Sequence, residues 1–455
     1  MMTETTPTTG FRRAVDGFGR YVYPFFGATL CTAAHIFPTW DVLFAYITLL
    51  LGLLLTAVLR ELYPMLVPSL FYFFSANRAH SPGPPVFSDY YHQPHIAILT
   101  LSYILICVAT FILFALATRR RQKPRISKNY LSMLPFFFAM IVGGVGNEKA
   151  GWADLGYAVV LAASFSVLYL AFRPHMRGRR DSQFIMRLFV ALGLAILGMI
   201  AFTHYDFYVT NGVSADKTVF SVGWGVTTSV GLTLTMLIPP AFYLAAVKPR
   251  HVYYISFATL FLLATPFAFS RGGMLFGAIV YLLSVFLYLY LRGLRRAVRI
   301  LSLVCVCGLL AVVILAIFSA SVRELLASAF HDNGRYEIFS LALTKFIENP
   351  LFGAGFYDSY SNEWVFDVMP HFYHNTYLQV LASAGIFGIV AYVYHRAVTV
   401  KTLLHRRTPE AFFGMLGILA IMLASFLDVL FFIFYPGLLY SLYLIVMEND
   451  AEEPL

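Results

Sequence analysis

Residues 95–117 read His95-Ile-Ala-Ile-Leu-Thr-Leu-Ser-Tyr-Ile-Leu-Ile-Cys-Val-Ala-Thr-Phe-Ile-Leu-Phe-Ala-Leu-Ala117, 23 residues without one Asp, Glu, Lys or Arg. A helix of about 20 apolar residues is long enough to cross the hydrocarbon core of a bilayer. The rest of the chain is similar, since 59% of its 455 residues are hydrophobic and only 12% are charged. Soluble domains are about 25% charged. The composition therefore excludes an ordinary soluble enzyme and predicts a membrane protein.

Apolar runs of this kind recur along the whole chain. They cover 21–37, 41–59, 62–76, 95–117, 131–146, 153–172, 188–204, 220–247, 252–270, 274–291, 300–320, 376–394, 411–427 and 429–447. Because the turns within 21–59 and 411–447 are weak, we expect 12 to 14 transmembrane helices in an all-α polytopic fold. The predicted parts are an N-terminal tail (1–20), a helical bundle (21–320), a large hydrophilic loop with a short helix (321–375), the last helices (376–447) and a C-terminal tail (448–455).

The distribution of positive charge predicts the orientation. With the N-terminus inside and fourteen alternating spans, 25 of the 32 Lys and Arg residues fall on the inner side, as the positive-inside rule requires. Both termini are then cytoplasmic, and 21–37 is an uncleaved first span because no convincing cleavage pattern follows it. The net charge of +9 is explained by topology, so nucleic acid is not an expected partner. The four cysteines lie within apolar runs and predict neither a disulfide nor a metal framework.

Few ionisable side chains fall in the middle of the predicted spans, which disfavours an ion-coupled transporter. We therefore expect the functional residues on the outer face. There, Ser270-Arg271-Gly272 forms a very short turn between two runs, which places Arg271 at the rim of the membrane. Anchoring of the hairpin by a snorkelling arginine is one explanation, and a functional cation is the other.

The loop 321–375 contains a second arginine, in Gly334-Arg335. Possible caps before it and Pro350 after it predict a helix over 336–349. In the first turn of that helix, an anion would interact with both the guanidinium and the free backbone N–H groups. A salt bridge from Arg335 to Glu324 or Glu337 is the alternative.

A histidine opens the next predicted span, in His374-Asn375-Thr376. Such a histidine can act as a base or serve as a polar cap of a transmembrane helix. His371 and His374 have a spacing that could indicate a metal site, but no Cys, Asp or Glu nearby completes a ligand set. We expect no metal there.

Four motifs in this order resemble the O-antigen ligase and polymerase family of bacterial membrane enzymes. They are Ser-Arg-Gly (270–272), Gly-Arg (334–335), Asn-Pro-Leu-Phe-Gly-x-Gly-Phe (349–356) and His-Asn-x-x-Leu-x-x-Leu-x-x-x-Gly-x-x-Gly (374–388). The resemblance implies a helical membrane glycosyltransferase of GT-C-like type with its active site on the extracytoplasmic side of the bacterial inner membrane. It implies a glycan donor on undecaprenyl pyrophosphate and a saccharide or lipid-anchored acceptor, without cofactor or metal.

The resemblance also implies roles for individual residues. Arg271 and Arg335 would hold the pyrophosphate, and His374 would position or deprotonate the acceptor hydroxyl. The weaker substrate-binding candidates are Ser270, Gly334, Asn375, Tyr377 and Gln379. Many relatives carry an acid where this chain has Ala382-Ser383-Ala384, so that function would be performed elsewhere or not at all. A protein hydroxyl as acceptor, or transport of a lipid-linked glycan or small anion, are the alternatives.

Overall fold

The computed structural model describes residues 8–75, 94–118, 126–147, 152–176, 178–213, 215–217, 220–223, 225–248, 252–320, 334–356 and 372–449. Within them the chain forms 16 α-helices and one antiparallel pair of two-residue strands. Seven of these helices are long and apolar enough to cross a membrane. The expected all-α, polytopic membrane protein is therefore confirmed. His371, the segments 321–333 and 357–371 of the predicted loop, and the C-terminal tail beyond residue 449 lie outside the described residues.

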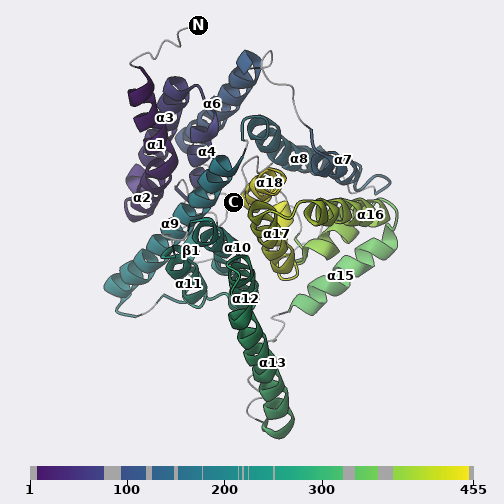
Figure 1. The fold of residues 1–455 in the computed structure, drawn as a ribbon. Coiled ribbons are helices and arrows are strands. Elements are labelled where there is room, and N and C mark those ends of the chain that lie inside the picture. The colour runs from purple at the N-terminus through teal and green to yellow at the C-terminus, as the bar shows by residue number, and fades with distance from the viewer. Residues whose placement is uncertain are drawn as a thin grey trace.

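The helices form three neighbouring groups (Figure 1). The first group comprises α1 (Thr8–Tyr21), α2 (Tyr23–Ile36), α3 (Asp41–Leu59), α4 (Leu66–Ser75) and α6 (Pro94–Thr118), with 3-10 turns at Pro38–Trp40 and Tyr63–Met65. The central group comprises α9 (Arg179–Asn211), β1 (Ser221–Val222), β2 (Gly225–Val226), α10 (Thr227–Val247), α11 (Tyr254–Ala264), α12 (Arg271–Leu291) and α13 (Arg295–Phe318). The third group comprises α7 (Lys128–Ile141), α8 (Trp152–Phe172), α15 (Arg335–Glu348), α16 (Thr376–His405), α17 (Pro409–Ala424), a 3-10 turn at Leu430–Phe432 and α18 (Phe434–Glu448). Helix α13 projects away from the rest.

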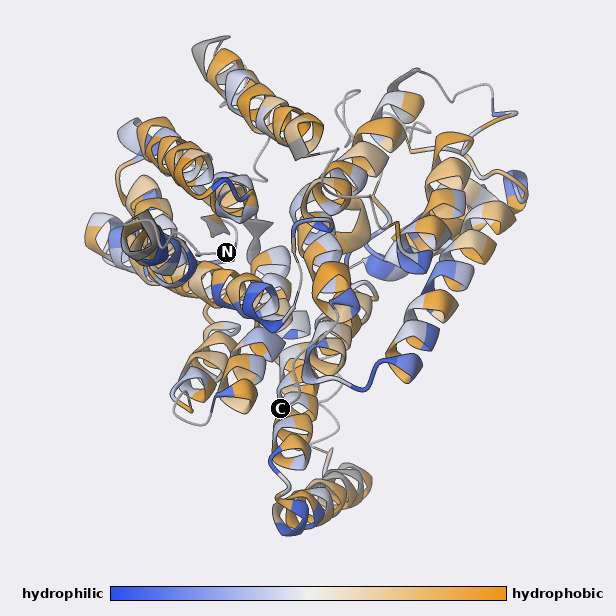
Figure 2. Ribbon diagram, turned by 45° about the horizontal axis from the view of Figure 1, so that its top comes forward, coloured by the Kyte–Doolittle hydropathy of each residue, from blue (hydrophilic) through white to orange (hydrophobic). Residues whose placement is uncertain are grey.

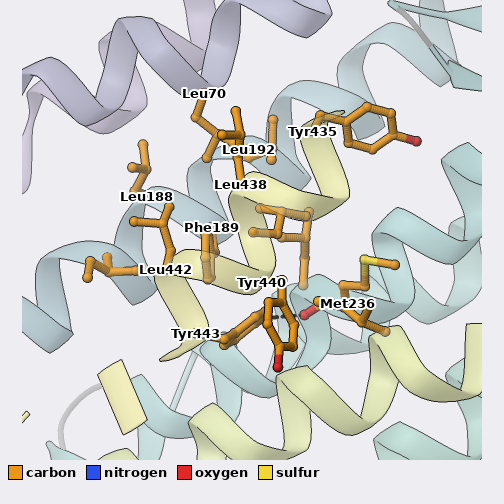
Figure 3. Close-up of a cluster of buried hydrophobic side chains, with 14 of the residues drawn as sticks. Leu70, Leu188, Phe189, Leu192, Met236, Tyr435, Leu438, Tyr440, Leu442 and Tyr443 are labelled. Carbon is orange, nitrogen blue, oxygen red and sulfur yellow. Dashed lines mark hydrogen bonds between the residues drawn. The ribbon is translucent and has the colours of Figure 1, made fainter. Parts of the chain in front are cut away.

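Helices α9, α10 and α18 build the core where the groups meet (Figure 3). Side chains such as Phe189 of α9 and Leu442 of α18 are fully buried there. The hydroxyl of Tyr443 donates to the carbonyl of Met236, which satisfies its polar end within the apolar core. A Cβ on Gly417 would lie 2.1 Å from the ring of Tyr443. Only glycine therefore allows α17 to pack this closely against α18.

Buried ion pairs gather at one end of the bundle, which we call the ion-pair end. It contains three ion pairs: Arg20 with Asp181 at 2.6 Å, Arg173 with Glu448 at 3.2 Å, and Arg179 with Glu410 at 3.1 Å. The first pair joins the end of α1 to the start of α9, and the second joins the residue after α8 to the end of α18. The third joins the starts of α9 and α17. Figure 2 shows the same organisation, with hydrophobic residues along most helices and hydrophilic residues mainly near their ends.

Every predicted apolar run contains an α-helix, but several boundaries differ from the predictions. The run 220–247 begins with the strand pair, and its helix starts only at Thr227. The helix of the run 252–270 ends at Ala264, because Pro266 and a left-handed Phe269 (φ 53°) follow it in a turn. Helices α4 and α11, with 10 and 11 residues, are too short to span a bilayer. The count of 12 to 14 spans therefore stays a prediction.

Candidate active site

Three helices begin at the predicted site residues. Arg271 is the first residue of α12, Arg335 is the first residue of α15, and His374 lies two residues before α16. The start of a helix carries free N–H groups and a partial positive charge of about half a unit. Two cationic side chains therefore stand at helix ends that already favour anions.

Two of the predicted substrate-binding residues are side-chain N-caps of these helices. The hydroxyl of Ser270 accepts from the N–H of Gly273 at 3.0 Å. The Asn375 side chain accepts from the N–H groups of Tyr377 and Leu378 at 2.9 and 3.0 Å. Both side chains are buried, and they stabilise the starts of α12 and α16.

Gly334 precedes α15 with φ 81° and has no side chain to cap it. This left-handed conformation costs glycine no steric strain. The first N–H groups of α15 therefore receive no side-chain cap from residue 334, and Arg335 follows directly.

The start of α12 packs on α10 at unusually short range. A Cβ on Gly231 of α10 would lie 2.2 Å from the Cβ of Ser270, and one on Gly273 would lie 2.9 Å from the backbone of Gly231. The hydroxyl of Ser270 also donates to the carbonyl of Thr228 at 3.3 Å. The backbone on both sides of Arg271 is therefore held against a deeply buried helix.

The segment after α17 holds the start of α16. The N–H of Thr376 donates to the carbonyl of Ser425 at 2.8 Å, and the Asn375 amide donates to the carbonyl of Phe426 at 3.1 Å. The hydroxyl of Thr376 donates to the carbonyl of Asp428 at 3.1 Å. These bonds fix the backbone that carries His374.

The same segment connects α16 with α12. A Cβ on Gly272 would lie 2.5 Å from the side chain of Leu427, so the backbone next to Arg271 contacts the residue next to Asp428. The structure therefore brings Arg271 and His374 to one end of the bundle, which we call the Arg271 end.

His374 pairs with an acid that was not among the predicted site residues. Its Nδ1 lies 3.6 Å from Oδ1 of Asp428, and the side chain of His374 is 49% exposed whereas that of Asp428 is 12% exposed. Asp428 Oδ1 also accepts from the N–H of Val429 at 2.9 Å. A carboxylate near Nδ1 can orient the imidazole, which leaves Nε2 for a substrate.

The backbone of His374 adopts a left-handed conformation, with φ 49°. Such a conformation is uncommon outside glycine and needs support from both sides. On one side the N–H of Tyr373 donates to the Gln379 side chain at 3.0 Å, and on the other Asn375 caps α16. Gln379 is fully buried and also donates to Ser383. The Gln379 side chain therefore helps to fix the backbone next to His374.

Tyr377 lies in the first turn of α16 and is half-buried. Its hydroxyl donates to the carbonyl of Met422 at 3.1 Å, and its ring packs against Phe426 with centroids 4.6 Å apart. These contacts hold the ring between α16 and α17.

Helix α15 lies along α16. Its buried Ala342 packs with Tyr373 and Ala382 in a small separate cluster. Arg335 is two turns before Ala342 on α15, and Tyr373 is the neighbour of His374. The predicted helix 336–349 is thus confirmed, at Arg335–Glu348.

Helix α16 is broken at Gly385 (φ 60°, ψ −153°), and the segment 349–355 fills the break. The N–H of Ala354 donates to the carbonyl of Ala382 at 2.7 Å, and the N–H of Ile386 donates to the carbonyl of Pro350 at 2.9 Å. A Cβ on Gly385 would lie 2.4 Å from the carbonyl oxygen of Leu351. The glycine-rich motif therefore satisfies backbone groups that the broken helix leaves open.

One comparison with known proteins finds a match over this part of the chain. The family model described as O-antigen ligase matches residues 255–393. This chain contains an O-antigen ligase family domain. That domain runs from α11 into α16 and includes Arg271, Arg335 and His374. A comparison with curated proteins finds no match.

Asp428 lies outside the matched residues 255–393 and between the predicted apolar runs 411–427 and 429–447. It is the single acidic residue between Glu410 and Glu448 and interrupts two apolar runs. A single acid between two apolar runs is the feature of the sequence that could have indicated a functional Asp428. In the part of the chain that the structure describes, no three His, Cys, Asp or Glu side chains are grouped to hold a metal ion.

Proposed function

We propose that this protein is a glycosyltransferase that moves a glycan from an undecaprenyl-pyrophosphate donor to a saccharide acceptor. The observation that carries the proposal is that the O-antigen ligase match includes both helix-start arginines and the histidine that faces Asp428. A diphosphate ester is a good leaving group when cations neutralise the charge that develops on it. The enzyme would therefore act as a ligase or polymerase in the synthesis of cell-surface polysaccharide.

The proposed reaction is a single displacement. The acceptor hydroxyl attacks the anomeric carbon, and the bond from that carbon to the pyrophosphate oxygen breaks. Nε2 of His374 takes the hydroxyl proton, while Asp428 stabilises the imidazolium that forms. Arg271 and Arg335 offset the negative charge on the departing undecaprenyl pyrophosphate, together with the N–H groups at the starts of α12 and α15.

We further infer that the Arg271 end faces the extracytoplasmic side of the bacterial inner membrane. The ion-pair end contains Arg20, Arg173 and Arg179, and basic residues accumulate on the cytoplasmic side. Arg271 lies at the opposite end of the bundle. Labelling of a cysteine introduced at Tyr336, which is 71% exposed next to Arg335, by a membrane-impermeant maleimide in intact spheroplasts tests this orientation. Protection until the membrane is opened would refute it.

The test of the function is transfer in a reconstituted assay with purified protein, lipid-linked glycan and candidate acceptors. We expect Arg271→Ala, Arg335→Ala and His374→Ala each to reduce transfer by at least about 100-fold, the magnitude typical of losing one transition-state contact. Two matched controls lie at the opposite ends of the same helices. Arg292 directly follows the last residue of α12, and His405 is the last residue of α16. Arg292→Ala and His405→Ala should both retain transfer. Near-normal transfer in all three site variants would refute the proposal.

A further inference from the structure

His204 contacts the segment that leads into Arg271, although it comes from a different helix. It lies near the end of α9, and its Nε2 is 2.7 Å from the carbonyl oxygen of Phe267. A carbonyl oxygen can only accept, so Nε2 carries a hydrogen and donates it. Helices α9 and α11 and strand β1 are neighbours here (Figure 1).

The ring of His204 also packs among three phenylalanines. Its centroid lies 5.6 Å from that of Phe269, 5.7 Å from that of Phe220 and 6.2 Å from that of Phe267. Phe220 is buried and contacts Phe269 edge to face at 5.7 Å. The histidine thus holds the turn through one hydrogen bond and through its ring.

The turn that His204 holds is strained. Phe269 has φ 53°, a left-handed conformation that is rare for a residue other than glycine and persists only where the surroundings enforce it. Within the turn, Phe269 N–H donates to the carbonyl of Pro266 at 2.9 Å and Ser270 N–H donates to that of Thr265 at 3.2 Å. The strained residue lies two positions before Arg271.

We propose that His204 is a positioning residue for Arg271. By holding Phe267 and Phe269, it fixes the direction in which the chain enters Ser270 and α12, and thereby where the guanidinium stands. The inference rests on the proposed function, because it gives Arg271 a role in transfer. A misplacement of about 1 Å at a reacting group can reduce the rate by about 100-fold. A hydrogen bond that holds the turn before Arg271 can therefore change the rate of transfer.

Two substitutions separate the hydrogen bond from the ring. His204→Gln keeps an N–H donor at nearly the reach of Nε2, whereas His204→Phe keeps an aromatic ring without a donor. We expect His204→Phe to lower kcat for transfer by about 10- to 100-fold with little change in KM for the acceptor, and His204→Gln to restore most of the rate. Equal losses in both variants, or none in His204→Phe, would overturn the proposal.

A double-mutant cycle tests whether His204 acts through Arg271. In an Arg271→Lys background, which retains a cation for measurable transfer, His204→Phe should cause much less than its single-variant loss. A full additional loss would mean that His204 acts independently, and the proposal would be wrong.

Hydrogen exchange provides a readout independent of transfer. His204→Phe should increase exchange of the amides in 265–273 but leave the far half of α12 unchanged, whereas uniform or absent change contradicts the inference. If His204→Phe does not fold, His204→Leu replaces it in the comparison with His204→Gln. Near-normal transfer by Arg271→Ala would instead count against the proposed function, and the exchange result would still decide whether His204 holds the turn.

Discussion

The pair of His374 and Asp428 gives a quantitative prediction for Asp428→Asn. Two unit charges 3.6 Å apart attract by about 1 kcal/mol in bulk water and by about 5 kcal/mol at an effective dielectric constant of 20. Because His374 is about half exposed (49%), the lower part of this range applies, about 1.4–2.8 kcal/mol. That stabilisation of the imidazolium is lost when Asn replaces Asp, so kcat should fall by about 10- to 100-fold.

The assay is transfer by purified protein at saturating donor and acceptor. His374→Ala should lose more than Asp428→Asn, and the double variant should be no slower than His374→Ala alone, because Asp428 acts through the histidine. Glu348→Gln is the matched control, since it removes a carboxylate from an exposed pair with Lys345 inside the matched domain. Wild-type activity in Asp428→Asn, or losses that add in the double variant, would refute the mechanism.

Three further predictions concern packing, charge and metal dependence. Gly231→Ala places a Cβ 2.2 Å from that of Ser270 and should lower stability by about 1–3 kcal/mol, measured as thermal unfolding in detergent; Gly156→Ala in α8, with no atom within 4 Å, should not. Glu448→Gln leaves the buried Arg173 without its carboxylate partner and should cost about 3–5 kcal/mol while kcat of the folded fraction stays unchanged; a loss of kcat without loss of stability would contradict this. Transfer should continue in excess EDTA, and a loss restored by a divalent cation would show metal dependence.

The helical architecture and the region of the site could be predicted from the sequence because both depend on local patterns. Apolar runs of sufficient length require helices in a membrane, and the cap and proline around 336–349 predicted α15 to within one residue. Arg396 shows the limit. It follows the predicted apolar run 376–394, which places it in an inner loop. In the structure α16 continues to His405, and the Arg396 guanidinium is buried against the hydroxyls of Tyr392 and Tyr440. Positive charge alone does not distinguish a loop from a buried arginine with phenol partners.

The site contacts that the sequence did not predict all join segments far apart in the chain. Asp428 meets His374 only because the segment after α17 accepts hydrogen bonds from the start of α16. His204 meets Phe267 only because α9 packs beside α11. Motif spacing reports neighbours along one helix or turn, and neither contact is of that kind. The side chains of the candidates Ser270, Asn375 and Gln379 form hydrogen bonds within the protein, and their contact with substrate stays a prediction.

The break in α16 has a consequence for how this domain can be divided. The segment 349–355 is bonded to both halves of the broken helix, and the carbonyls of Phe352 and Ala354 also accept from Gly144 and Asn147 after α7. Residues 255–393 therefore depend on a turn more than a hundred residues earlier in the chain. Expressed alone, or grafted into another bundle, they would leave the carbonyls of Phe352 and Ala354, in the segment that fills the break in α16, without these two hydrogen-bond donors. Exchange of substrate specificity between relatives should accordingly move the turn at 142–147 together with the glycine-rich segment.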